Sequence, residues 1–275
     1  MSKVTKLKIS DNLEQDIEKL IQPIIGSISD LIKPTDRVLL KPNFNTADSF
    51  PASTDIDFLE AIINIIKKAN PKEIIVGESC TYFLNTEKVC QQKGAQEIIE
   101  KLNVTWHNFD ANKWVKVKIP NGKYFKNIRI PKITQKVDKI IFLPCLKTHR
   151  LAKFTMSLKV TVGMLKPIER GPLHLSHLEP RISEIASVFN PDLVIIDGRK
   201  CFVTQGPESG QLEIPNILLA GTDRIALDVE GLKILQSYNA ENMLGNDPWA
   251  LEQIIKAVEL GLGAKSESDY EVVEL

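Results

Sequence analysis

Short apolar runs of strand length recur along this chain, and segments with helical spacing of apolar residues separate them. The clearest runs are "RVLLKPN", "EIIVGES", "KIIFLPC" and "LVIIDGR", each of which ends in polar residues or glycine. Residues 54–70 ("TDIDFLEAIINIIKKAN") and 224–238 ("RIALDVEGLKILQSY") have the pattern of helices. Apolar strands that alternate with helices are typical of an α/β fold, in which helices cover both faces of a mostly parallel sheet.

One segment, at about residues 112–133, interrupts this alternation. The stretch "WVKVKIPNGKYFKNIRIP" alternates apolar and polar residues around an Asn-Gly pair, which predicts a β-hairpin inserted into the α/β order. No repeat, low-complexity tract or linker divides the sequence. We therefore expect a single α/β domain over residues 1–275, with the hairpin as an insertion.

The charge balance excludes a strong electrostatic field around the whole molecule. The chain has 35 Lys and Arg residues and 35 Asp and Glu residues, so its formal net charge is zero. We expect neither nucleic acid nor a membrane as a partner, because the field that attracts such polyanions is missing. The apolar runs are too short to span a bilayer, and the N-terminus lacks a secretory signal. The sequence therefore predicts a cytoplasmic protein.

Neither the cysteines nor the histidines form a recognisable metal motif. The four cysteines are scattered without a Cys-x-x-Cys pair, so we interpret them as reduced thiols. His174 and His177 have a spacing that a metal site can use, but no further ligand signature accompanies them. The sequence therefore identifies no metal and no cofactor.

Polar residues follow the apolar runs at the points where the predicted strands end. The carboxyl ends of parallel strands share one edge of the sheet, where loops and helix N-termini bind ligands. We expect this edge to carry Lys41, Asn43, Glu78, Ser79, Lys147, Thr148, His149, Asp197, Gly198 and Asp223.

The stretch "IIFLPCLKTHRLAKFTMSLKVTVGMLK", from Ile140 to Lys166, is the most informative part of this edge. It places lysines, a histidine and several hydroxyl groups just after an apolar run. Ammonium and hydroxyl groups suit a phosphate or a carboxylate, and a histidine can carry a proton. A solvated loop is the alternative, although "FTMSLKVTVGM" is too apolar for an ordinary exposed loop. We predict these ligand-binding residues: Lys41, Asn43, Ser79, Lys147, Thr148 and Lys159.

His149, His174 and Asp197 are the predicted catalytic residues. His174 follows a Gly-Pro loop, from which it could reach the pocket as an acid or a base. Asp197 ends an apolar run, where a carboxylate can orient a histidine, hold a metal ion or pair with a lysine. For Asp223, which precedes the helical segment "RIALD", helix capping is the favoured interpretation.

The order of these motifs resembles that of the domain of unknown function 362 family. The motifs are "LLKPN", "VGES", "LPCLKTH", "FTMSLKVTVGM", "DLVIIDG", "GPESG" and "GTDRIALD", and they cover nearly the whole chain. The resemblance implies the fold and a shared site but no reaction, because the activity of the family is unassigned. Many relatives have Lys at the position of Cys145, so an essential thiol is not expected there.

Many members of that family also carry ferredoxin-type iron–sulfur segments, which this chain lacks. The resemblance therefore implies that any electron-transfer role requires a separate iron–sulfur protein as a partner.

Two functions remain open at this point. The first is an enzyme for a small anionic metabolite, in which lysines bind the phosphate or carboxylate, a histidine moves a proton and Asp197 orients that histidine. The second is a non-catalytic or redox-accessory module that binds an anionic ligand or docks an iron–sulfur protein. Convergence of Lys147, His149 and Asp197 in one pocket would favour the enzyme.

Overall fold

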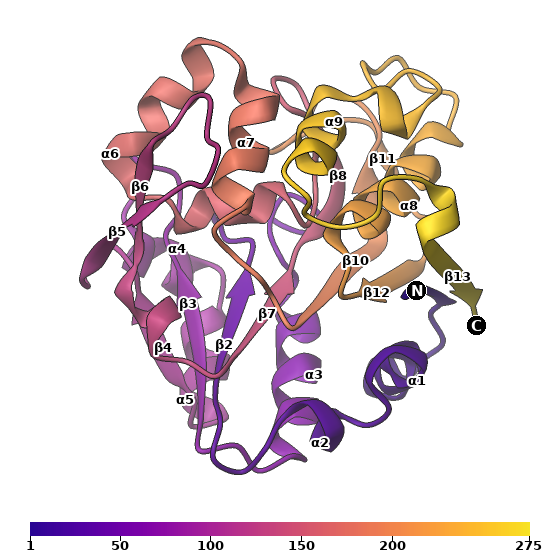
Figure 1. The fold of residues 1–275 in the computed structure, drawn as a ribbon. Coiled ribbons are helices and arrows are strands. Elements are labelled where there is room, and N and C mark those ends of the chain that lie inside the picture. Colours follow the sequence, from indigo (N-terminus) through magenta and orange to yellow (C-terminus); the bar gives the residue numbers. More distant parts are fainter.

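The computed structural model describes the backbone of residues 1–275 and every side chain except that of His174. It contains an 11-stranded sheet whose main path has the order β13-β1-β12-β10-β7-β2-β3-β4 (Figure 1). These strands comprise Tyr270–Glu274 (β13), Ser2–Lys8 (β1), Ile217–Gly221 (β12), Leu193–Phe202 (β10), Lys139–Leu143 (β7), Arg37–Pro42 (β2), Glu73–Glu78 (β3) and Thr105–Asn108 (β4).

Strand direction divides this sheet into two parts. From β10 to β4 all neighbouring strands are parallel, as their continuous apolar runs predict. The strand β12 is antiparallel to both β10 and β1, and β1 is parallel to β13. The sheet is therefore mixed but mostly parallel, which confirms the predicted α/β fold.

The expected position of Asp223 is wrong, because Asp223 follows the antiparallel strand β12. It therefore lies at the edge of the sheet opposite to the carboxyl end of β10. There it is the N-cap of α8 (Arg224–Gln236), and its carboxylate accepts hydrogen bonds from the N–H groups of Ile225 and Ala226. The favoured capping interpretation of Asp223 agrees with this geometry.

Helices cover both faces of the sheet and enclose two hydrophobic cores. On one face lie α1 (Leu13–Ile25), α2 (Ile28–Leu31), α3 (Ile56–Lys67), α4 (Thr86–Gln92) and α5 (Ala95–Lys101). On the other face lie α7 (Leu178–Ala186), α8 and α9 (Glu252–Glu259). The pleat of β2 supplies both cores, since Val38 and Leu40 pack in the first and Leu39 packs in the second.

The predicted hairpin insertion is confirmed. Strands β5 (Trp114–Lys118) and β6 (Asn127–Pro131) pair antiparallel as a separate two-stranded sheet. The carboxylate of Glu184 in α7 accepts hydrogen bonds from the N–H groups of Lys123 and Phe125 at 2.6 and 3.0 Å, which anchors the connecting loop. The organisation of residues 1–275 as one domain stays a prediction.

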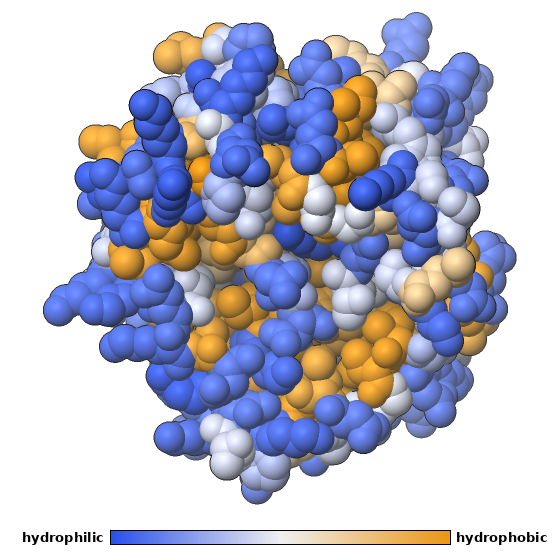
Figure 2. Space-filling view, viewed as in Figure 1, coloured by the Kyte–Doolittle hydropathy of each residue, from blue (hydrophilic) through white to orange (hydrophobic). Residues whose placement is uncertain are grey.

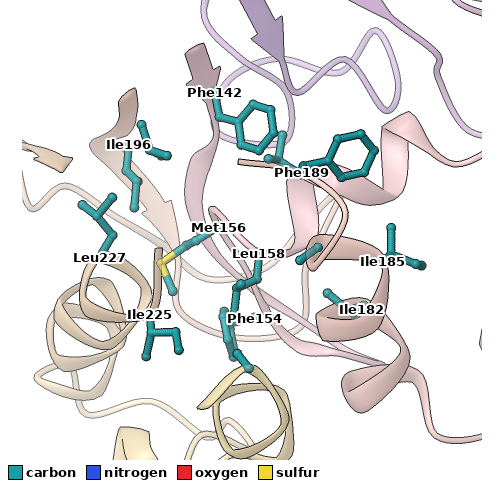
Figure 3. Packing of buried hydrophobic residues seen from close by; sticks show 14 of the residues in the cluster. Phe142, Phe154, Met156, Leu158, Ile182, Ile185, Phe189, Ile196, Ile225 and Leu227 are labelled. Atoms are coloured by element: carbon teal, nitrogen blue, oxygen red, sulfur yellow. The ribbon is translucent and has the colours of Figure 1, made fainter. Parts of the chain in front are cut away.

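The segment after β7 forms strands and a 3-10 helix instead of a long loop. β8 (Cys145–His149) pairs with β10 and with β9 (Lys153–Thr155), and η2 (Lys159–Met164) follows. Figure 3 shows the labelled side chains Phe154, Met156 and Leu158 between those of α7 and α8. The apolar character of this segment is thus explained by its place in the core.

The remaining elements are short. They are β11 (Leu212–Glu213), α6 (Pro167–Arg170), η1 (Lys132–Gln135), η3 (Gly171–Leu175), η4 (Pro248–Ala250) and η5 (Glu267–Asp269). On the face drawn in Figure 2, hydrophilic and hydrophobic residues are interspersed. Of the helices that the structure describes, none is long and apolar enough to cross a membrane.

Candidate functional site

A pocket with a volume of about 300 Å³ lies at the carboxyl ends of β2, β3 and β8. Residues of η2, α6 and the loop after β10 complete its wall, so segments that are far apart in the sequence meet here. The following predicted site residues line it: Lys41, Asn43, Ser79, Lys147, His149 and Lys159.

The strand β8 determines which of its side chains reach this pocket. Side chains alternate between the two faces of a strand, and Lys147 and His149 line the pocket. Thr148 lies between them, and its Oγ1 donates a hydrogen bond to the carbonyl oxygen of Phe202 at 3.1 Å. The predicted ligand-binding residue Thr148 therefore lies outside the pocket, on the other face of the strand.

Lys41 is buried beside a carboxylate, that of Glu78. The Nζ atom of Lys41 lies 2.6 Å from Glu78 Oε1, and the two side chains are 1% and 2% exposed. The carboxylate also accepts hydrogen bonds from the N–H groups of Phe44 and Ser79, both at 2.8 Å. Burial lowers the pKa of Lys41, and the charge of Glu78 opposes this effect. One cation of the pocket is thus balanced by a carboxylate.

Lys147 is equally buried, but its hydrogen-bond partners are carbonyl oxygens. Its Nζ donates to the backbone oxygens of Ala52 and Pro207, the latter at 3.1 Å. Burial lowers the pKa of Lys147. Among the residues that the structure describes, no carboxylate forms an ion pair with this ammonium group. The charges of Glu208 and Asp48 raise the pKa of Lys147 and offset part of the cost of burying it, and a bound anion in direct contact would offset more.

Lys159 begins η2 and is less deeply buried than the other two lysines. Its Nζ donates no hydrogen bond to any described residue. Burial and the nearby ammonium group of Lys147 lower the pKa of Lys159 to about 7. At neutral pH roughly half of this amine is therefore uncharged.

Arg170 is a pocket residue that the sequence patterns missed. Its guanidinium donates to the carbonyl oxygen of Cys80 and to Ser79 Oγ, both at 2.6 Å. Ser79 Oγ in turn donates to Asp110 at 2.6 Å. The partners of Arg170 lie 90 and 91 residues earlier in the sequence. The spacing of residues along the chain therefore could not predict that Arg170 lies in the pocket. Burial lowers the pKa of Arg170.

Two further polar groups in the pocket wall have unused hydrogen-bonding capacity. Within the described part of the chain, Thr155 Oγ1 is buried without a hydrogen-bond partner, and Asn43 Nδ2 has no partner within hydrogen-bond distance, although Asn43 is near enough to Cys145 to lower the pKa of that thiol. Thr155 lies directly opposite Lys147 in the β8–β9 ladder. Since buried polar atoms are nearly always paired, an oxygen-rich ligand beside Lys147 would satisfy both groups.

The imidazole of His149 is held in one orientation. Its Nδ1 accepts hydrogen bonds from the N–H groups of Leu151 and Ala152, both at 3.1 Å. An accepting Nδ1 carries no proton, so the proton of the neutral ring is on Nε2. The side chain of His174, another predicted catalytic residue, lies outside the described part of the structure, and the preceding Leu173 lines the pocket.

Asp197 is fully buried outside the pocket wall. The guanidinium of Arg199 binds its carboxylate at 2.7 to 3.2 Å. Burial raises the pKa of Asp197, and Arg199 opposes this effect. Lys147 and His149 are thus brought together by the fold, whereas Asp197 is paired elsewhere. Its predicted catalytic role stays a prediction.

The mouth of the pocket is partly apolar. Tyr82 and Phe83 line it and are 58% and 71% exposed, and Leu151 lies on the same rim. Pro207 and Glu208 of the "GPESG" loop also line the pocket, and Glu208 accepts a hydrogen bond from Arg150 at 2.8 Å. A ligand therefore passes an apolar rim before it reaches the buried lysines.

Metal ligands and reactive thiols are not evident in this part of the fold. Of the residues whose side chains are described, no three His, Cys, Asp or Glu gather in a way that could hold a metal ion. Cys145 is fully buried, and burial raises its pKa, so it is a protonated and unreactive thiol.

Solved structures with a partly similar fold share little sequence with this chain. The lactate racemase apoprotein from Thermoanaerobacterium thermosaccharolyticum has a TM-score of 0.45 and 12% identity over 72% of this chain and 50% of the racemase. A Thermotoga maritima protein has a TM-score of 0.43 and 13% identity over 69% of this chain and 50% of its own. The chain thus spans about half the length of each.

A curated relative is similar over most of its length. Thylakoid-associated protein sll1697 of Synechocystis is 26% identical over 256 residues, which cover 88% of this chain and 78% of that protein. The family model described as a domain of unknown function (DUF362) matches residues 38–233, which include the pocket. The match extends over more than half of the chain, and the chain therefore belongs to the domain of unknown function 362 family.

Proposed function

We propose that this protein is an enzyme for a small metabolite that carries a phosphate or carboxylate group. The observation that carries the proposal is the environment of Lys147, a buried ammonium group whose hydrogen-bond partners among the described residues are carbonyl oxygens. The pocket wall also contains Asn43 Nδ2 and Thr155 Oγ1, for which the described residues provide no hydrogen-bond partner. A bound anion would balance the charge of Lys147 and accept these hydrogen bonds.

The other cations of the pocket have different roles in this proposal. Lys41 and Arg170 contribute positive potential, although Lys41 is already paired with Glu78. The neutral ring of His149 carries its proton on Nε2, and a histidine in the pocket wall suits an acid that protonates a developing oxygen charge. Asp197 does not converge with Lys147 and His149 in the pocket wall, so the proposed proton transfer rests on His149 without a carboxylate partner from Asp197.

Anion binding is tested by thermal unfolding of the full chain with inorganic phosphate and with malonate, at constant ionic strength. An anion held by Lys147 should raise the melting temperature steadily with the logarithm of the anion concentration, and the added stability should be about 2.7 kcal/mol at 100 times the dissociation constant. Lys147→Met, which keeps the apolar length of the side chain, should abolish the effect. The matched control Lys116→Met alters an exposed lysine of β5 and should retain it.

Equal stabilisation of Lys147→Met and the wild type would rule out the anion site. Catalysis needs a separate readout, so both proteins are incubated with a metabolite extract and the anionic compounds are followed by mass spectrometry. The wild type should consume a compound that persists with Lys147→Met.

A non-catalytic binding or docking module is the second candidate function. The exposed apolar side chains of Tyr82, Phe83 and Leu84 beside the pocket mouth favour it, since such groups often contact a partner. This function predicts that anions stabilise the protein while no compound in the extract is consumed. A separate iron–sulfur protein remains the proposed partner for this case.

A further inference from the structure

Lys159 differs from the other lysines of the pocket in how its amine is used. Lys41 and Lys147 donate hydrogen bonds to carboxylate or carbonyl oxygens. The amine of Lys159 reaches the same cavity but donates to no described residue. An amine with no hydrogen bond to break is accessible to a ligand at little cost.

The backbone that carries Lys159 is fixed on both sides. Leu158 and Val160 are buried in the core, at 0% and 4% exposure. The carboxylate of Asp228 in α8 accepts hydrogen bonds from the N–H groups of Ser157 and Leu158, at 2.8 and 3.0 Å. Figure 3 shows Leu158 enclosed by core side chains. The start of η2 therefore aims the side chain of Lys159 into the cavity from a rigid base.

The charge state of this amine suits nucleophilic attack. Only an uncharged amine has the lone pair that attacks a carbonyl carbon, and an ordinary lysine is almost fully protonated at neutral pH. Burial and the adjacent charge of Lys147 lower the pKa of Lys159 to about 7, so a large fraction of its amine is uncharged under these conditions. A cationic neighbour in a desolvated pocket is a known means of activating a lysine.

We propose that Lys159 is the nucleophile that forms an imine with a substrate carrying both a carbonyl carbon and an anionic group, the latter bound by Lys147. The choice of an anionic substrate rests on the function proposed above. Lys147 thus has two roles, because its charge adds to the effect of burial in lowering the pKa of Lys159, and because it holds the anion that brings the carbonyl group to that amine.

The chemical step is balanced without any external oxidant or reductant. The Nζ of Lys159 adds to the carbonyl carbon, so a C–N bond forms while the C=O π bond breaks, and one proton passes from nitrogen to oxygen to give a neutral carbinolamine. The hydroxyl group takes up a second proton and leaves as water when the C–O bond breaks, and the nitrogen lone pair forms the C=N bond of a protonated imine, which can return that proton. The anionic group of the substrate offsets the positive charge of a protonated imine beside Lys147.

Reductive trapping of the full chain tests this role. The protein is incubated at pH 7 with glyoxylate, a small aldehyde with a carboxylate, and cyanoborohydride, which reduces an imine to a stable secondary amine. Peptide mass spectrometry should find one added carboxymethyl group on Lys159, formed at least about tenfold faster than on exposed lysines because roughly one in 2,500 of those is uncharged at pH 7. Lys159→Arg should remove this fast labelling, and the control Lys200→Arg, at an exposed position of β10, should not.

Acetaldehyde, which has no anionic group, separates the two proposals. The ratio of glyoxylate to acetaldehyde labelling at Lys159 should exceed 1 in the wild type and fall in Lys147→Met. Labelling of Lys159 no faster than that of exposed lysines would overturn the proposed role of Lys159 as a nucleophile. Stabilisation of the protein by anions would still support the proposed binding function in that case. Fast labelling of Lys159 together with an unchanged glyoxylate-to-acetaldehyde ratio in Lys147→Met would support Lys159 as a nucleophile. It would overturn the proposal that Lys147 selects an anionic substrate.

Discussion

The buried charges of the pocket have unequal electrostatic environments. Lys41 forms an ion pair with Glu78, whereas Lys147 is near carbonyl oxygens and Lys159 is partly neutral. The close approach of η2 protects the ion pair, since a Cβ added at Gly163 would lie 2.9 Å from Lys41 Nζ. We infer that the Lys41–Glu78 pair is a structural part of the pocket floor, and that the other two lysines are left for a ligand.

Removal of the carboxylate charge at Glu78 tests this view of the floor. Glu78→Gln should destabilise the protein by about 3 to 5 kcal/mol, because it leaves the buried ammonium of Lys41 without a counter-charge. The control is Glu60→Gln. Glu60 pairs with Lys101 at the surface, so this substitution should lower the free energy of unfolding by less than about 1 kcal/mol. Urea unfolding measures both.

The double variant Lys41→Met/Glu78→Gln provides the second check on the same pair. It should be more stable than Glu78→Gln alone, because no unpaired buried charge remains. If the Glu78 and Glu60 variants lose equal stability, the pair is not a structural element of the pocket.

At the scale of elements, the sequence located much of the pocket through one rule. Lys41, Ser79 and Lys147 follow or end apolar runs, and the parallel strands β2, β3, β7 and β8 bring their carboxyl ends together. Strand direction, however, is not encoded in an apolar run. The sequence pattern therefore predicts the wrong edge of the sheet for Asp223, because nothing in "NILLAGTD" distinguishes the antiparallel β12 from a parallel strand.

Side-chain direction and long-range pairing were also beyond the sequence patterns. If residues 145–149 were a loop, Thr148 could face the pocket like its neighbours. The segment is instead the strand β8, which pairs with the long strand β10, so the side chain of Thr148 points to the opposite face. Arg170 joins the pocket through contacts with Ser79 and Cys80, which local periodicity cannot reveal. The patterns thus predicted which elements meet but not all of the side chains that face the cavity.

The element that carries Lys159 depends on Asp228, and this dependence should be visible in the pH profile of stability. Burial raises the pKa of Asp228 to about 6. Between about pH 4 and pH 6 the folded protein retains a proton that the unfolded chain has released. The raised pKa of Asp228 therefore adds up to about 3 kcal/mol to the free energy of unfolding below pH 4. This contribution is lost as the pH rises through 6.

Asp228→Asn should remove that part of the pH dependence, because an amide does not titrate. The measurement is the free energy of unfolding at pH 4 and at pH 6, from urea titrations of the wild type and the variant. Asp247→Asn is the control, since Asp247 is an exposed cap of η4 and should leave the difference unchanged. A wild-type difference that persists in Asp228→Asn would contradict the assignment.

At the scale of the whole molecule, one sheet joins the two hydrophobic cores. The central strands place alternate residues in each core, and the pocket draws on segments from both halves of the chain. The N-terminal strand β1 lies between β12 and β13, so the ends of the described chain meet in the same sheet (Figure 1). This continuity is the physical basis for predicting that residues 1–275 unfold as one cooperative unit.

Single-tryptophan variants test that cooperativity, because the two cores have different tryptophans. Trp106 packs against the core under α1 to α5, and Trp249 packs against the core under α7 to α9. One variant, Trp114→Phe/Trp249→Phe, retains Trp106, and the other, Trp106→Phe/Trp114→Phe, retains Trp249. In each variant, the urea midpoint measured by tryptophan fluorescence should coincide with the midpoint measured by far-UV circular dichroism. Because both midpoints come from the same variant, a change in stability caused by the substitutions does not affect the comparison. A fluorescence midpoint that departs from the dichroism midpoint in either variant would mean that the cores unfold separately and that the chain contains more than one domain.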